Sequence, residues 1–227
     1  MNLSILIPSL NEYDNLCFLI PRIHKSLSNM DIKYEIIIID SFKTDLKTKN
    51  LAKEYGLVHI NRDNSNSYGD AVRSGIKNAK GEIVIFMDAD GSHDPEEIKS
   101  LYEMANKSDL AISSRYLDKS FNEKPFFGSL FLNWLCNKFF NIECSDISNS
   151  FKAYKLKHLK ALNVTSSNID IIEEIVLSLN DEIQNFKILE RPANFLGRKY
   201  GKSKREPMKF FISYIITLFR IKFFNKL

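Results

Sequence analysis

The stretch Tyr34-Glu35-Ile36-Ile37-Ile38-Ile39-Asp40 decides the fold class of this chain. Four consecutive isoleucines leave no side chain for a water-facing surface, which is the pattern of a parallel strand covered on both faces. The run Ile83-Val84-Ile85-Phe86-Met87 repeats this pattern, and each of the two runs is followed by an aspartate. The sequence therefore predicts a buried sheet with polar side chains where its strands end.

Helical and strand-like segments alternate on both sides of the isoleucine run. Within 14–28, leucines and isoleucines recur at spacings of three and four, which predicts a helix. The remaining expectations for the first half are strands at 3–8, 57–60, 82–87 and 110–113, with helices ending near residue 55 and spanning 68–79 and 95–106. This β-α-β-α order predicts an α/β fold on a doubly wound parallel sheet.

The second half of the chain is less regular. It predicts a loop at 117–127, an aromatic-rich helix at 128–140, strands at 150–154 and 186–190, and a helix at 169–179. The chain contains no linker, repeat or low-complexity segment. We therefore expect one catalytic domain over 1–206 and a C-terminal amphipathic helix over 207–227.

Asp88-Ala89-Asp90 is the first candidate site, because ligands of such sheets bind at the carboxyl ends of the strands. Two carboxylates at a strand end suit Mg²⁺ or Mn²⁺, hard cations that proteins often share with phosphates. Ser92 could complete the metal shell. The alternative is an ordinary solvated acidic turn.

Polar residues follow the other predicted strands as well. Asn11 and Glu12 come after Pro8, and with Asp40 they would lie side by side and could bind a ribose or a base. For Asn11 the alternative is a helix N-cap. Arg115 follows the strand at 110–113 and could reach a diphosphate, or it could be a surface arginine.

Two segments containing glycine are weaker candidates for binding phosphate. Gly69 begins a predicted helix and would allow close approach of a phosphate, with assistance from Arg73. The basic run 198–205 also contains a glycine and could grip a phosphate, although a solvated linker is the alternative.

Charge is distributed unevenly along a chain of otherwise ordinary composition. Residues 198–227 contain nine Lys or Arg and one acidic residue, whereas the rest contains 23 basic and 27 acidic residues. Such asymmetry indicates an anionic partner, either nucleic acid or a membrane surface. In 207–224, polar residues form one narrow stripe, and the predicted membrane face consists of Phe210, Phe211, Ile215, Leu218, Phe219 and Phe223.

With these motifs assembled, the chain resembles the family 2 glycosyltransferases, and within them the dolichyl-phosphate mannosyltransferases and other polyprenyl-phosphate glycosyltransferases. The resemblance covers nearly the whole chain. It is carried by residues 7–16, 38–40 with Asp45, 68–75, 86–95, 113–116, 145–152 and 198–204.

The resemblance implies a GT-A-like fold, with a mixed and mostly parallel sheet flanked by helices. It implies inverting transfer from a nucleoside-diphosphate sugar, with GDP-mannose favoured, to a polyprenyl phosphate. Asp88 and Asp90 would hold Mg²⁺ or Mn²⁺ near Ser92, and Asp90 and Arg115 would be the catalytic residues. The nucleotide would be bound by Pro8, Asn11, Glu12, Asp40, Arg73 and Asp88, and the acceptor phosphate by Arg115, Lys152, Arg198, Ser203 and Lys204.

Several departures from the family pattern affect the expected identity of the acceptor and of the nucleotide base, whereas the expected metal site is unchanged. Ser41 and Phe42 replace the usual Asp and Gly, Asn149 replaces a Gly, and Lys152 replaces an Arg. The segment 117–127 lacks the arginines that normally follow the Arg-Tyr pair.

Two rival functions remain open. One is transfer to a glycan hydroxyl, which a well-placed carboxylate near Asp146 or Glu173 would favour. The other is non-catalytic binding of nucleic acid by the basic tail, which we do not expect, because the aromatic residues of the tail lie on a helix. Three cysteines without metal-ligand spacing and the absence of a signal sequence predict a cytoplasmic protein. The aromatic face of the C-terminal helix and the resemblance to family members that associate only peripherally predict that it binds a membrane surface.

Overall fold

The computed structural model describes residues 1–117, 127–200 and 207–224, and for 127–129, 207–212 and 224 the backbone alone. Its seven-stranded sheet has the order β3-β2-β1-β4-β6-β5-β7. The strands are β1 (Leu3–Pro8), β2 (Tyr34–Asp40), β3 (Val58–Asn61), β4 (Ile83–Phe86), β5 (Leu110–Ser114), β6 (Lys152–Lys155) and β7 (Ile188–Pro192). The helices are α1 (Tyr13–Leu27), α2 (Leu46–Glu54), α3 (Tyr68–Asn78), the 3₁₀ turn η1 (Pro95–Glu97), α4 (Ile98–Ala105), α5 (Phe127–Phe140), α6 (Leu156–Ala161), α7 (Ile171–Glu182) and α8 (Pro207–Phe224).

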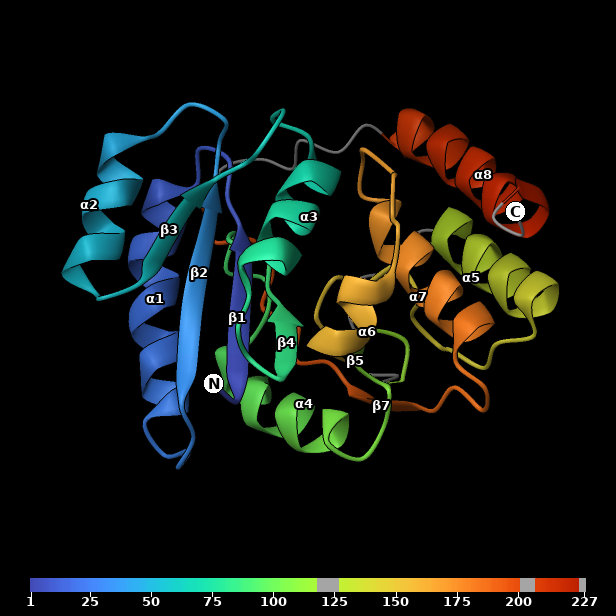
Figure 1. Cartoon of the computed structure of the whole chain (residues 1–227), viewed down its shortest axis with the longest axis horizontal. Helices are drawn as coiled ribbons and strands as arrows, with labels where there is room; N and C mark the ends of the chain where they lie inside the picture. The colour runs from blue at the N-terminus through green and yellow to red at the C-terminus, as the bar shows by residue number, and fades with distance from the viewer. Residues whose placement is uncertain (118–126, 201–206, 225–227) are drawn as a thin grey trace.

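Helices cover both faces of the sheet and make a three-layered molecule (Figure 1). One apolar cluster joins the sheet to α3, α5, α6, α7 and α8, and a second joins its other face to α1, α2 and α4. All four isoleucines of β2 are buried, and they alternate between these two clusters. This explains why the strand is apolar along its whole length.

The register of the central strands brings the candidate site residues to one edge of the sheet. In the parallel pairs, Leu6 of β1 lies opposite Ile37 of β2 and Phe86 of β4. The carboxyl ends of these strands therefore lie at the same edge, and the strand order changes direction at β1. In such sheets this is where ligands bind.

The sheet is mixed rather than purely parallel. Strand β6 lies between β4 and β5 and is antiparallel to both. The mixed, mostly parallel sheet that the family resemblance implies is confirmed, and among the described strands β6 alone departs from the doubly wound parallel sheet predicted from the element order. The sequence also gave no prediction of α6, which directly follows β6.

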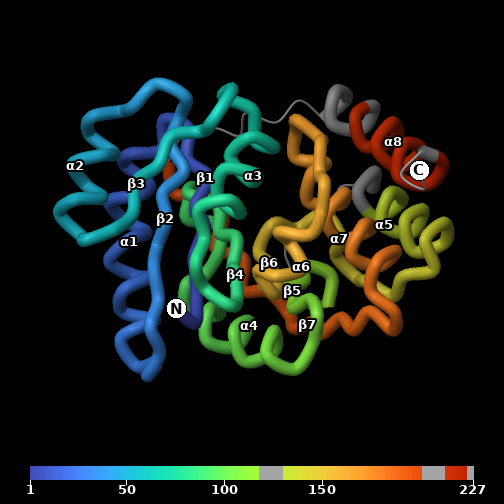
Figure 2. The backbone as a smooth tube through the Cα atoms, viewed as in Figure 1, coloured from blue at the N-terminus to red at the C-terminus, as the bar shows by residue number. Residues whose placement is uncertain are grey.

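Helix α8 packs on α5 and α7 at one end of the molecule (Figure 2). Its Tyr214, Leu218 and Ile221 are buried in the core cluster of that face of the sheet. The prediction that Leu218 faces a membrane is therefore wrong. Helix α8 thus shares the core of the preceding residues. The division of the chain into 1–206 and 207–227 stays a prediction.

Two residues of the polar stripe of α8, Thr217 and Arg220, face α7 rather than water. Thr217 Oγ1 donates a 2.6 Å hydrogen bond to Asp170, and Arg220 Nη2 lies 2.8 Å from a carboxylate oxygen of Glu174. Both acidic side chains are buried in α7 or at its start. Phe219 and Phe223 remain 56 % and 61 % exposed. None of the helices in the described ranges is long and apolar enough to cross a bilayer.

Candidate active site

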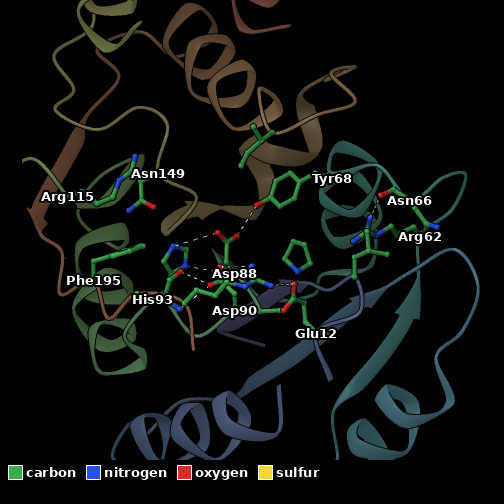
Figure 3. A pocket seen from close by; sticks show the side chains of 17 residues that line it. Glu12, Arg62, Asn66, Tyr68, Asp88, Asp90, His93, Arg115, Asn149 and Phe195 are labelled. Atoms are coloured by element: carbon green, nitrogen blue, oxygen red, sulfur yellow. Dashed lines mark hydrogen bonds and ion pairs between the residues drawn. The ribbon is translucent and has the colours of Figure 1, made fainter. Parts of the chain in front are cut away.

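A cleft of about 580 Å³ opens at the carboxyl edge of the sheet. In Figure 3, Asp88, Asp90 and Glu12 lie at its centre, with Arg115 and Asn149 on one side and Arg62 and Asn66 on the other. Its described lining is Pro8, Leu10, Glu12, Arg62, Asn66, Tyr68, Asp88, Ala89, Asp90, Ser92, His93, Arg115, Asn149, Ile169, Phe195, Gly197 and Arg198. These residues come from almost every loop at this edge.

The turn after β4 presents both aspartates to the cleft. Gly91 follows with φ +79°, a left-handed conformation that glycine adopts without strain, and it turns the chain back after Asp90. The backbone N–H of Ser92 and its hydroxyl both donate to Oδ1 of Asp90, at 3.1 and 2.6 Å. Ser92 therefore orients the Asp90 carboxylate.

His93 lies next to Asp88, the other aspartate of this turn. Its ring is buried and stacks on Phe151 with a centroid separation of 4.7 Å. Nδ1 accepts a hydrogen bond from the backbone N–H of Asp88, so the ring proton lies on Nε2, 3.9 Å from Oδ2 of Asp88. Burial lowers the pKa of His93 more than the nearby Asp88 and Asp90 raise it, and the ring is neutral at neutral pH.

Arg115, directly after β5, lines the cleft, and its guanidinium is held by the buried carboxylate of Asp146. Nε and Nη2 donate to the two carboxylate oxygens of Asp146 at 2.8 Å, and Nη2 also donates to Ser148. Burial opposes the charge on this guanidinium, but the hydrogen bond and the charge of Asp146 outweigh it and raise the pKa of Arg115. The side chain is therefore a permanent cation in the wall of the cleft.

Residues 193–200, which we call the post-β7 segment, contribute Phe195, Gly197 and Arg198 to the cleft. The backbone N–H of Leu196 donates to the carbonyl of Ser92 at 2.9 Å, and that of Lys199 donates to the carbonyl of Asp90 at 3.1 Å. This pairing brings Arg198 over the aspartates. Its Nη2 lies 2.5 Å from Oε1 of Glu12, and its Nη1 lies 3.3 Å from Oδ2 of Asp90.

The third wall comes from the start of α3 and the end of β3. Tyr68 donates a 3.3 Å hydrogen bond from its hydroxyl to Oδ1 of Asp88. Arg62 is buried and spans two loops, donating to the carbonyl of Ser9 at 2.8 Å and to that of Asn66. Arg62 therefore ties together the loops after β1 and β3.

The residues of the cleft fit a divalent cation shared with phosphates. Within the described ranges, no three His, Cys, Asp or Glu side chains cluster as a metal site of their own. A cation bound with a diphosphate needs few protein ligands, because phosphate oxygens and water complete its shell. Asp88 and Asp90, each 22 % exposed, would supply the protein's oxygen donors, and Asp90 already holds the cationic guanidinium of Arg198.

Several residues predicted from the sequence do meet in this one cleft. They are Pro8, Glu12, Asp88, Asp90, Ser92, Arg115 and Arg198. Their roles in binding metal, nucleotide and phosphate stay predictions. Ser203 and Lys204 lie outside the described residues.

The structure contradicts the predicted role of Lys152. Its side chain is fully buried in β6, and its ammonium donates to the backbone carbonyls of Ile147 and Asn149. Burial lowers the pKa of Lys152. An ammonium enclosed in this way cannot meet an acceptor phosphate, so Lys152 stabilises the loop before β6 instead.

The start of α3 is also occupied by protein rather than open to a phosphate. A Cβ on Gly69 would lie 2.0 Å from the carbonyl oxygen of Ser166, so glycine is needed for close packing of the chain. Arg73 donates to the same carbonyl at 2.7 Å and does not line the cleft. Arg73 does not join the other predicted residues in this cleft, and its binding of the nucleotide stays a prediction.

Asn11 and Asp40 lie near the cleft but outside its lining. The Asp40 carboxylate is buried and accepts hydrogen bonds from the backbone N–H groups of Ser41 and Asp45, and it lies 3.1 Å from His59. Asn11 is exposed with φ +56° and shapes the turn after β1. Neither residue lines this cleft, and their binding of the nucleoside remains a prediction.

Four cleft residues were missed as candidates, namely Arg62, Asn66, Tyr68 and Phe195. Arg62 directly follows β3, so the rule that polar residues after strands carry function would have found it. Tyr68 belongs to the segment 68–75 that carries the family resemblance, but the sequence analysis assigned it no role. Phe195 is brought to the site by an isolated bridge to His93, for which the sequence contains no local signal.

Comparison with known proteins identifies both relatives and fold. The chain is 29 % identical to a dolichol-phosphate mannosyltransferase of Pyrococcus furiosus, over 97 % of the chain and 64 % of that protein. It is 27 % identical to the undecaprenyl-phosphate 4-deoxy-4-formamido-L-arabinose transferase of Edwardsiella ictaluri, over 91 % and 63 %. The chain thus spans less than two thirds of the length of these relatives.

Solved structures of glucosyl-3-phosphoglycerate synthase from Mycobacterium tuberculosis share the fold. A complex with Mn²⁺, UDP and glucosyl-3-phosphoglycerate superposes with a TM-score of 0.74 at 17 % identity, covering 96 % of this chain and 78 % of that one. A complex with Mg²⁺ and UDP gives 0.73 at 16 % identity, with the same coverage. The expected GT-A-like fold is confirmed. The family model "Glycosyl transferase family 2" matches residues 4–163, and the chain therefore belongs to this family.

Proposed function

We propose that this protein transfers a sugar from a nucleoside-diphosphate sugar to a polyprenyl phosphate, with Mg²⁺ or Mn²⁺ as cofactor. The observation that carries the proposal is the cleft in which Asp88 and Asp90 face the cations Arg115 and Arg198. Carboxylates that hold a metal beside fixed arginines suit a substrate rich in phosphate. The two relatives described above are both named for prenyl-phosphate substrates.

The residues of the cleft divide the work as follows. A metal held by Asp88 and Asp90 would supply positive charge to the departing diphosphate. Ser92 and Tyr68 donate hydrogen bonds to these two carboxylates, and His93 accepts one from the backbone N–H of Asp88. Arg115 is fixed by Asp146 and presents a permanent positive charge to a phosphate group of the donor or the acceptor.

A phosphate acceptor fits the cleft better than a hydroxyl acceptor. A phosphate monoester is already anionic near neutral pH, since its second pKa is about 6. Positioning and electrostatics then replace a general base. A hydroxyl acceptor requires a base, but Asp146 and Glu173, the carboxylates considered for it, are 0 % and 1 % exposed and do not line the cleft. Of the carboxylates that do line it, Glu12 and Asp90 are paired with Arg198, and Asp88 is assigned to the metal.

Membrane association is part of the proposal. The exposed aromatic residues of α5 and α8 include Phe131, Trp134, Phe139, Phe219 and Phe223. The two helices pack together, so these side chains belong to one end of the molecule (Figure 2). An exposed apolar surface beside basic residues suits the interface of an anionic membrane. We place the protein on the cytoplasmic surface of such a membrane, where prenyl phosphates are presented.

The test is a transfer assay after a donor screen. Thermal shift with nucleoside-diphosphate sugars and Mn²⁺ identifies the donor, because binding raises apparent stability, and we expect GDP-mannose to give the largest shift. The donor is then offered with a polyprenyl phosphate, the matching polyprenol and a soluble sugar. We expect product only with the phosphate. Transfer to the polyprenol or the sugar at an equal rate would contradict the proposed acceptor.

A further inference from the structure

Arg198 occupies the space between two carboxylates that the proposed reaction needs. Its three guanidinium nitrogens all have partners, since Nη2 pairs with Glu12 at 2.5 Å, Nη1 with Asp90 at 3.3 Å, and Nε donates to the carbonyl of Tyr200 at 2.7 Å. The guanidinium is 22 % exposed, so it is partly shielded from water. This is an ion-pair geometry that a planar guanidinium fills well.

The position of Arg198 conflicts with metal binding by Asp90. Oδ1 of Asp90 receives both the backbone N–H and the hydroxyl of Ser92, and Oδ2 receives Nη1 of Arg198. A divalent cation at Oδ2 would lie next to a positive guanidinium, and like charges at such a distance repel strongly in a partly buried site. One of the two cations has to leave this oxygen.

The backbone around Arg198 is fixed, so the side chain alone can make this change. Leu196 and Lys199 on either side are paired with the backbone of the aspartate turn. Tyr200 is held at both its N–H and its carbonyl by the side chain of Asn15. A rotation of the Arg198 side chain breaks two ion pairs and leaves the rim of the cleft in place.

We propose that Arg198 is an internal substitute for the metal ion, holding Glu12 and Asp90 in the donor-free protein and releasing Asp90 when cation and nucleoside diphosphate bind together. The inference rests on the proposed function. The diphosphate offers the released guanidinium a new anionic partner in the same cleft. Metal alone must displace Arg198 without this compensation, so metal and nucleotide bind with positive cooperativity.

The test measures the affinity of Mn²⁺ rather than activity. Mn²⁺ is titrated into the full-length protein by calorimetry or paramagnetic resonance, alone and with saturating GDP or UDP. For the wild type we expect the nucleotide to tighten Mn²⁺ binding by about 5- to 150-fold, the usual range of coupling between two ligands. In Arg198→Gln, Mn²⁺ alone should bind more tightly than in the wild type, and the effect of the nucleotide should shrink.

Two control variants separate a specific pair from general electrostatics. Lys199→Gln removes a neighbouring positive charge of the same segment that lies over the Phe18 ring. Arg22→Gln removes an arginine that pairs with Asp94 at 3.1 Å, beside the same turn. Both should leave the nucleotide effect on Mn²⁺ affinity within twofold of the wild-type value, as the pair with Asp90 is intact. Thermal unfolding checks that each variant is folded.

The outcomes distinguish this inference from the proposed function. If the wild type binds Mn²⁺ and nucleotide but Arg198→Gln binds Mn²⁺ alone no more tightly, the inference about Arg198 is wrong and the function stands. An equal increase of Mn²⁺ affinity in Lys199→Gln also overturns it, because charge alone then explains the effect. If the wild type binds no Mn²⁺ with either nucleotide, both proposals fail.

Discussion

Arg115 and Asp146 are joined by two parallel hydrogen bonds of 2.8 Å, from Nε and Nη2 of the guanidinium to the two carboxylate oxygens. The backbone N–H of Arg115 donates to the same carboxylate at 2.9 Å. Asp146 is fully buried, so the pair holds Arg115 in one orientation at the wall of the cleft.

Arg115→Ala should therefore lose both activity and stability. Transfer should slow by the equivalent of about 1.5–3 kcal/mol, the usual contribution of a charged hydrogen bond. The unfolding free energy should fall by a similar amount, because Asp146 loses its partner in the interior. Steady-state kinetics and denaturant unfolding measure the two effects. Lys77→Ala, which breaks an exposed ion pair with Asp63, is the control and should change neither. An active, equally stable Arg115→Ala protein would contradict this role.

Asp88→Asn and Asp90→Asn should each reduce transfer by at least about a hundredfold while the fold survives. The reason is that an amide oxygen carries no full negative charge for the metal. Mn²⁺ titration and a transfer assay check this, with circular dichroism as the folding control. Glu96→Gln changes an exposed carboxylate close to the same turn and should retain activity. Full turnover by the double variant would remove the metal assignment.

The stability of the protein should decline as pH falls below about 6.5, the ordinary pKa of histidine. Burial lowers the pKa of His93, so below that pH the unfolded chain binds a proton that the folded protein resists. Stability from this source is complete above the unfolded pKa and is lost towards the lowered folded value. His93→Asn keeps an acceptor for the Asp88 N–H and should flatten the slope below pH 6.5, measured by urea unfolding.

His158 provides the comparison for this pH effect. Burial also lowers the pKa of His158, which lies in α6, a helix that contributes no described residue to the cleft. His158→Asn should remove a separate part of the slope and leave Mn²⁺ binding unchanged. If the slope in His93→Asn equals that of the wild type, His93 does not contribute to acid destabilisation.

Membrane binding is testable without removing α8. Because Tyr214, Leu218 and Ile221 are core residues, deleting 207–227 should destabilise the whole protein. The double variant Phe219→Ser/Phe223→Ser changes only exposed side chains. It should keep the wild-type unfolding temperature but partition to anionic liposomes at least about tenfold more weakly, since each phenylalanine loses apolar contact.

Leu46→Ser is the matched control for this experiment. Leu46 is 70 % exposed on α2, which belongs to the opposite apolar cluster from α5 and α8. Its replacement should leave flotation with liposomes unchanged. Equal flotation of the wild type and the double phenylalanine variant would mean that this face does not contact the membrane.

The contacts of the polar stripe of α8 with α7 should also be measurable as stability. Arg220→Met removes the partner of the buried Glu174 and should reduce the unfolding free energy by about 1.5–3 kcal/mol. Lys222→Met, two residues along the same helix, removes an exposed ammonium and should have a smaller effect. A smaller loss for Arg220→Met than for Lys222→Met would show that α8 is not held by this pair.

The sequence by itself determined the central strands and the position of the turn that carries Asp88 and Asp90. The four isoleucines of β2 allow no other burial than between two layers. The positions of Asp40 at the end of β2 and of Asp88 just after β4 follow from where those strands end. Such local patterns are readable because one element carries the whole signal. The edge that holds the cleft followed from the same patterns, since parallel strands place their carboxyl ends together.

Only the tertiary structure decided which partners the site residues have and which face of α8 is buried. Arg115 meets Asp146 across 31 residues, and Arg198 meets Asp90 across 108. In the sequence, the polar stripe of α8 is typical of a water-facing surface. In the structure, its Thr217 and Arg220 meet Asp170 and Glu174. A buried polar group is stable only where its partner is present, and partners so distant in sequence are brought together by packing of the sheet and helices, not by any local pattern.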